Sequence, residues 1–85
     1  MNQTTPTTLA ELHIGAQAKI AGFTLAVEIQ QRLMELGLTK GATCTLVRVA
    51  PMGDPIEVQV RGYHLSLRKS EAQGILIAPL APASL

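Results

Sequence analysis

The fold is decided by the stretch PMGDPIEVQVRGYHLSLR, which spans residues 51–68. Apolar residues alternate with polar ones from Ile56 to Arg61 and again from Tyr63 to Arg68, which is the period of a strand with one buried face. Gly62 permits a tight turn between the two runs, and we expect a turn of type II′. The prolines and the glycine before Ile56 predict a loop that leads into the first strand. The stretch therefore predicts a loop followed by a β-hairpin.

Three further strands are expected on either side of this hairpin. Their expected ranges are 17–23, 42–50 and 75–77. Within the first range, Ala18 and Ile20 fall on one face, and Gly22 indicates a bend or a close backbone approach. A sheet of about five short strands must close or nearly close to cover its inner face. We therefore expect a mainly β protein that forms a small, strongly bent barrel.

One α-helix is expected between the first two of these strands, over residues 24–36. Its apolar residues recur at spacings that place them on one face, and they are Leu25, Ile29, Leu33 and Leu36. Thr24 is expected to cap the start of the helix, and Glu28 is expected to pair with Arg32 on the outer face. Gly37 is expected to end the helix in the left-handed conformation that glycine adopts without strain.

The chain of 85 residues is long enough for one domain and too short for two. We expect a flexible leader over residues 1–8, a barrel domain over 9–78 and a tail over 79–85. Short helical turns are expected at 8–12 and 70–74. The leader lacks the charge and apolar run of a secretory signal, and no stretch approaches the ~20 apolar residues that span a bilayer. These features predict a cytoplasmic protein.

The composition argues against nucleic-acid binding and against catalysis. The formal net charge is +1, and Phe23 and Tyr63 are the only aromatic residues, whereas nucleic-acid binders carry basic stripes and stacking aromatics. Cys44 falls mid-strand at a position expected to face the core, where cysteine behaves as a small hydrophobe. His64 and Ser66 share a strand face but lack the orienting group and oxyanion site of a serine nucleophile. We expect no enzyme activity and no cofactor.

The residues that could bind a metal ion do not follow a known ligand spacing. The candidates are His13, Cys44, Asp54, Glu57, His64 and Glu71. No metal site is therefore predicted from spacing. If the protein binds Fe(II) directly, the available ligands are His13, Asp54, Glu57 and His64.

Several segments together resemble the ferrous iron transport protein A (FeoA) family. In the first half these are LHIG at 12–15, AKIAGF at 18–23 and RLMELGLTKG at 32–41. In the second half these are APMGDPI at 50–56, RGY at 61–63, LSLR at 65–68, EA at 71–72 and ILI at 75–77. Lys40 stands where the family often has proline, and Met52 stands where leucine is common. The order and spacing of these segments over residues 9–77 carry the resemblance.

The resemblance implies an SH3-like barrel with an inserted helix. It also implies a small cytosolic accessory of bacterial ferrous iron uptake that binds the FeoB permease, through its cytosolic GTP-binding region, at the inner face of the cytoplasmic membrane. No catalytic residues and no agreed metal ligands come with the family. Two alternatives stay open: a direct Fe(II) carrier or sensor, and a module that contacts a metal-dependent transcription regulator. Self-association is open as well, because the edge strands of an unclosed barrel can pair between chains.

Two places are expected to contact the partner. One is the end of the helix with the turn that follows it, and its residues are Leu36, Gly37, Leu38 and Lys40. Leu38 is expected either to be partly exposed there or to cap the core. The other is the loop before the hairpin, and its residues are Met52, Gly53 and Asp54.

Overall fold

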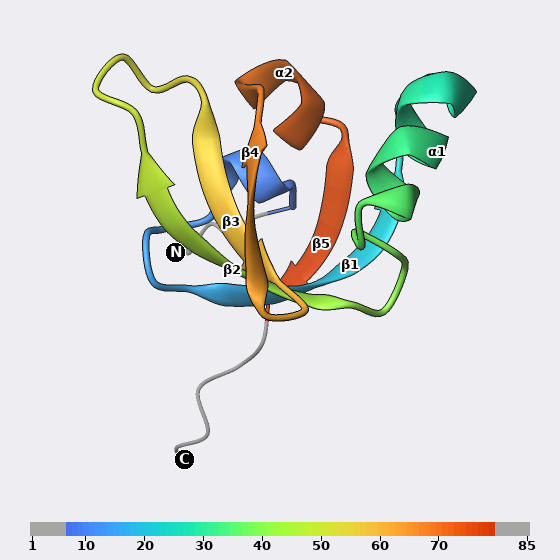
Figure 1. Cartoon of the computed structure of the whole chain (residues 1–85), viewed down its shortest axis with the longest axis horizontal. Helices are drawn as coiled ribbons and strands as arrows, with labels where there is room; N and C mark the ends of the chain where they lie inside the picture. Colours follow the sequence, from blue (N-terminus) through green and yellow to red (C-terminus); the bar gives the residue numbers. More distant parts are fainter. Residues whose placement is uncertain (1–6, 80–85) are drawn as a thin grey trace, which may run out of the picture.

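The computed structural model describes residues 7–79. One sharply bent sheet carries two helices on its rims (Figure 1). In chain order the elements are the 3₁₀ helix η1 (Leu9–Glu11), β1 (Gln17–Phe23), α1 (Val27–Glu35), β2 (Thr43–Val49), β3 (Ile56–Val60), β4 (Tyr63–Leu67), α2 (Lys69–Ala72) and β5 (Ile75–Pro79). The predicted strands and helical turns are confirmed within a few residues. The predicted leader and tail fall mostly outside the described residues, so the division of the chain into leader, domain and tail stays a prediction.

The five strands form a single antiparallel sheet in the order β4-β3-β2-β1-β5. The register shifts between Ile20 and Gly22 in β1 and between Leu46 and Arg48 in β2. Such bulges bend a strand and increase its twist, which lets so short a sheet wrap around its own core. The prediction of a mainly β, SH3-like fold is confirmed, but β4 and β5 do not pair with each other. The sheet is therefore an open barrel and not a closed one.

The inner face of the sheet is filled with aliphatic side chains. Among the described residues the buried core contains no polar or charged side chain, and its largest fully buried members are Leu9, Ile20, Leu33, Leu38, Leu67, Ile75, Val58, Val60 and Cys44. The alternation predicted for β3 is confirmed, because Ile56, Val58 and Val60 are buried. In β4 only Leu67 is fully buried, and Tyr63 at the start of the strand is 43% exposed.

The turn between β3 and β4 differs from the prediction. Arg61 and Gly62 have φ values of 51° and 86°, and two positive φ values at the central residues define type I′, not type II′. A positive φ is unfavourable for arginine, which carries a Cβ atom. The Arg61 side chain makes two hydrogen bonds from this position, described below, and these help to offset that cost.

The start of α1 also differs from the prediction. The helix begins at Val27 with Ala26 as its N-cap, and the Thr24 hydroxyl instead donates to the carbonyl of Gly74 at 3.5 Å. Arg32 does not pair with Glu28. It forms its ion pair with Glu71 of α2, which is far away in the sequence. Both expectations were wrong because a tertiary contact replaced the local one.

The end of α1 confirms the prediction in detail. Gly37 has a φ of 109°, and its N–H donates to the carbonyl of Met34 at 3.0 Å. The N–H of Leu38 donates to the carbonyl of Leu33, also at 3.0 Å. This pair of bonds is a Schellman motif, in which an apolar residue after the glycine packs against the last turn of the helix. Leu33 and Leu38 are both buried and supply that contact.

The first described residues pair with β5. The Thr7 carbonyl accepts a hydrogen bond of 3.1 Å from the N–H of Ile77, and Thr8 forms a β-bridge with Leu76. Thr7 and Thr8 belong to the segment predicted as leader. Thr8, the N-cap of η1, makes no side-chain cap, and the Glu11 carboxylate accepts a hydrogen bond of 2.7 Å from the Thr7 N–H. Within residues 7–79, no helix has the length and apolar character needed to cross a bilayer.

The buried thiol of Cys44 predicts a pH dependence of stability. Burial raises the pKa of Cys44 from 9.0 to about 11. Between these pH values the thiol therefore keeps its proton in the folded state and releases it in the unfolded state. The stability that goes with the protonated thiol is complete below pH 9 and is lost as the pH rises toward 11. We expect the free energy of unfolding, measured by urea denaturation with a reductant, to fall more steeply between these pH values in the wild type than in Cys44→Ala. Parallel curves would contradict the burial of this thiol.

Candidate interaction surface

The end of α1 is fastened to the turn between β3 and β4. The Tyr63 hydroxyl donates to the carbonyl of Leu36. Arg61 donates through Nε to the carbonyl of Gly37 at 3.3 Å and through its guanidinium to the Thr39 hydroxyl at 2.8 Å. The last carbonyls of a helix lack partners within the helix, so these side chains satisfy groups that would otherwise need water. We call residues 36–40 the helix-end turn.

The helix-end turn presents only some of its predicted contact residues. The Leu36 side chain is 40% exposed, and Lys40 is exposed. Gly37 and Leu38 are buried, and Leu38 has no exposed surface at all. The expectation that Leu38 is partly exposed was therefore wrong, and the alternative that it caps the core is confirmed. Its position in the Schellman motif directs it inward.

The loop before the hairpin is the second predicted contact place. Met52 is 91% exposed, the highest exposure among the large apolar residues that the structure describes. Gly53 has a φ of 88° and shapes the turn. The Asp54 carboxylate accepts a hydrogen bond of 2.9 Å from the N–H of Lys69, the first residue of α2. Asp54 therefore fastens the loop to α2, and Met52 is the member of this loop that is free to contact a partner.

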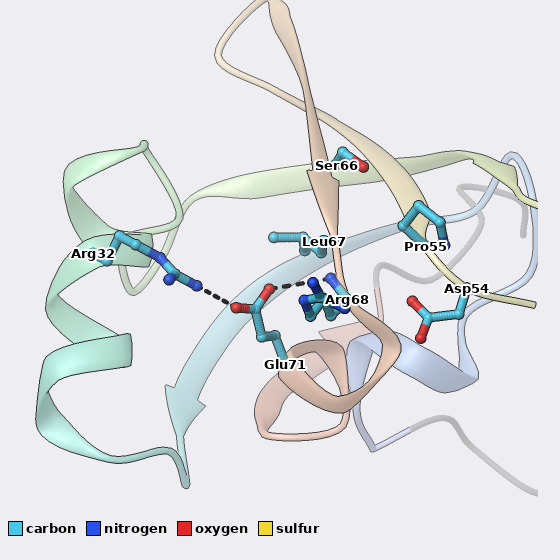
Figure 2. A pocket seen from close by; sticks show the side chains of 7 residues that line it. All are labelled: Arg32, Asp54, Pro55, Ser66, Leu67, Arg68 and Glu71. Carbon is cyan, nitrogen blue, oxygen red and sulfur yellow. Dashed lines mark hydrogen bonds and ion pairs between the residues drawn. The ribbon is translucent and has the colours of Figure 1, made fainter.

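A surface pocket of about 510 Å³ lies between α1, α2 and the end of β4 (Figure 2). Its lining residues are Arg32, Asp54, Pro55, Ser66, Leu67, Arg68 and Glu71. Glu71 bridges its two sides, because one carboxylate oxygen pairs with Arg32 and the other accepts from the Arg68 N–H at 3.1 Å. The sequence did not reveal this pocket. Arg32 and Glu71 are 39 residues apart, and no local pattern connects them.

The residues considered for metal binding are only partly brought together. His64 Nδ1 lies 2.6 Å from one oxygen of Glu57, and Arg48 Nε lies 3.5 Å from the other. Within residues 7–79 there is no cluster of three or more histidine, cysteine or acidic side chains arranged to hold a metal ion. His13 and Asp54 therefore do not lie in a cluster with Glu57 and His64. One oxygen of the Glu57 carboxylate is already paired with Arg48.

The open five-stranded barrel is a small SH3-like domain, and it exposes apolar side chains at a loop and at a helix end. Comparison with known families then gives its membership. Residues 7–79 match the model of the FeoA domain. The chain belongs to the FeoA domain family.

Three relatives illustrate the match. The chain is 37% identical over 67 residues to a Porphyromonas gingivalis Fe(2+) transport protein A/Fe(2+) transporter FeoB fusion protein, covering 79% of this chain but only 8% of that protein. It is 42% identical to the FeoA protein of Chlorobium tepidum, with a TM-score of 0.83 and coverage of 87% of this chain and 70% of the other. It is 34% identical to Stenotrophomonas maltophilia FeoA complexed with zinc, with a TM-score of 0.74 and coverage of 86% and 91%. The last is described as an SH3 domain protein.

The contact between Gly37 and Tyr63 predicts unequal effects of alanine at two glycines. A Cβ atom at Gly37 would lie 2.6 Å from the Tyr63 hydroxyl oxygen, whereas one at Gly41 would have no neighbour within 4 Å. Both glycines have positive φ values, 109° and 89°, so both alanine variants carry backbone strain. Because only Gly37→Ala adds a steric clash, we expect it to lower the free energy of unfolding by about 1–3 kcal/mol more than Gly41→Ala. Equal losses in urea denaturation would contradict the close packing of this turn.

Proposed function

We propose that this protein is a cytosolic accessory of ferrous iron uptake that acts by binding the FeoB permease, through the permease's GTP-binding region. The observation that carries the proposal is the relative in which a matching segment and an FeoB transporter form one polypeptide. Fusion of two proteins raises the local concentration of each for the other, which benefits domains that bind. The related Stenotrophomonas protein has been suggested to act as a ferrous iron transport activating factor.

The surface supports binding at two separate places. Figure 1 shows the loop between β2 and β3 at the opposite side of the molecule from the end of α1. Met52 is exposed on this loop, and Leu36 and Lys40 are exposed at the helix-end turn. Exposed apolar side chains within polar surroundings are the usual anchors of protein interfaces. The aliphatic side chains of the barrel interior are buried in the core and cannot contact a partner.

Binding of the purified protein to the GTP-binding region of FeoB tests this proposal directly. Biolayer interferometry should detect association in at least one of three states: nucleotide-free, GDP-bound and bound to a non-hydrolysable GTP analogue. Leu36→Glu or Met52→Glu should weaken it about tenfold or more, because losing a central anchor of an interface typically costs about 2 kcal/mol or more and about 1.4 kcal/mol corresponds to tenfold.

The matched control is Ile14→Glu, since Ile14 is an apolar residue that is 64% exposed and lies outside both contact places. This variant should bind like the wild type. No association in any nucleotide state would refute the proposed function. Equal weakening by all three variants would show that the two contact places are not specific.

A further inference from the structure

The two edges of the open sheet differ in what covers them. β5 forms one edge, and Thr7 and Thr8 pair with it through the N–H of Ile77 and the bridge to Leu76. β4 forms the other edge and pairs only with β3. Within residues 7–79 no backbone segment pairs with the outer side of β4. An unpaired strand edge is a ready template for another strand.

The register of the hairpin identifies the free backbone groups. Val60 and Tyr63 flank the two-residue turn, and pairs then follow at Val58 with Leu65 and at Ile56 with Leu67. In a hairpin of this kind the residues that flank the turn bond to each other, and bonded pairs alternate with non-bonded ones.

The intervening residues of β4 are His64 and Ser66, which lie opposite Gln59 and Glu57. The N–H and carbonyl groups of His64 and Ser66 therefore point away from β3, toward the open edge. Both side chains are exposed as well. Adding a strand here would complete the ladder without breaking an existing bond.

This edge runs between the two predicted contact places. At the start of β4, Tyr63 holds the carbonyl of Leu36 in the helix-end turn. Beyond its end, Arg68 shares the pocket of Figure 2 with Asp54 of the loop. A single extended segment laid along β4 would therefore contact both places.

The charge along this edge is positive. Residues 61–69 contain Arg61, Arg68 and Lys69 and no acidic residue. The nearby carboxylates already have partners: Asp54 with the Lys69 N–H, Glu57 with His64 and Arg48, and Glu71 with Arg32 and the Arg68 N–H. Within residues 7–79 no carboxylate pairs with the Arg68 guanidinium, which lines the pocket. A carboxylate brought by a partner would complement it.

We propose that the open edge of β4 binds an extended, acidic segment of a partner protein as an added strand, with the backbones of His64 and Ser66 forming the ladder and Arg68 binding a carboxylate in the adjoining pocket. This is the mode in which main-chain bonds supply affinity and side-chain pockets supply specificity. The inference deepens the proposed function and rests on it for the identity of the partner.

A second copy of this chain fits the edge less well. In an antiparallel pair of β4 strands centred on Leu65, Arg61 in the turn before β4 of one chain and Lys69 at the start of α2 of the other would lie at the same end of the pairing. Each end of the pairing would therefore bring two like charges close together, and these repel each other. An acidic segment is free of this repulsion.

The test uses an end-blocked heptapeptide in which glutamate alternates with valine, and a control peptide with lysine in place of glutamate. Titration into the ¹⁵N-labelled full chain should shift the amide resonances of His64 and Ser66 most strongly. It should also slow the hydrogen exchange of these two amides. The lysine peptide should bind at least about tenfold more weakly, and added salt should weaken the glutamate peptide.

Two pairs of variants separate the backbone contact from the charge contact. Ser66→Pro removes an outward N–H while keeping the bonds to β3, and it should weaken the glutamate peptide about tenfold or more, whereas Ser66→Val should not. Arg68→Gln should weaken the peptide about two- to fivefold, the range of an exposed ion pair. Lys19→Gln, on β1, should leave binding unchanged.

Shifts at β5, shifts at neither edge, equal binding of both peptides, or an unaltered affinity of Arg68→Gln would each overturn the proposal. Concentration-dependent dimerisation through β4 without peptide binding would overturn it too. If the wild type binds the FeoB region and Ser66→Pro and Arg68→Gln bind it equally well, the edge inference fails and the proposed function stands. If the wild type does not bind the FeoB region in any nucleotide state while the glutamate peptide occupies β4, the proposed function fails alone.

Discussion

The carbonyl groups that directly follow α1 receive hydrogen bonds from the hairpin of β3 and β4, from one residue of its turn and from the first residue of β4. Tyr63 donates to Leu36, and Arg61 donates to Gly37 and to the Thr39 hydroxyl. A helix end without such donors would have to stay in contact with water, and the positive charge of arginine also suits the negative end of the helix dipole. These bonds join the inserted helix to a hairpin more than twenty residues away, and they set where the exposed Leu36 lies on the surface.

Other residues of the segments that resemble the FeoA family have the same kind of role. The carboxylate of Asp54 fastens the loop before β3 to the start of α2, and Glu71 of α2 pairs with Arg32 of α1. Residues that look like binding determinants in the sequence therefore mainly connect elements of the fold to one another. Within the predicted contact places and beside them, the groups that remain available to a partner include the side chains of Leu36 and Met52, the outer edge of β4 and the guanidinium of Arg68.

The sequence predicted what depends on local chemistry. Strand alternation, the bend at Gly22 and the end of α1 at Gly37 all follow from periods and backbone preferences that act over a few residues. The start of α1 and the partner of Arg32 could not be predicted, because Gly74 and Glu71 are brought there only by the fold. The type of the hairpin turn was missed because Arg61 adopts a positive φ that its own long-range hydrogen bonds help to stabilise. The pocket beside β4 depends on the same distant contacts and was also invisible in the sequence.

The central claim is that the hairpin of β3 and β4 holds the helix end in place, and native-state hydrogen exchange of the wild type and Tyr63→Phe tests it most directly. The variant keeps the aromatic ring and loses only the hydroxyl that reaches Leu36. The account predicts faster exchange at the amides of Leu36, Gly37 and Leu38, with unchanged exchange in β1, β2 and β3. Unchanged exchange at the helix-end turn, or a uniform acceleration across the whole sheet, would contradict it.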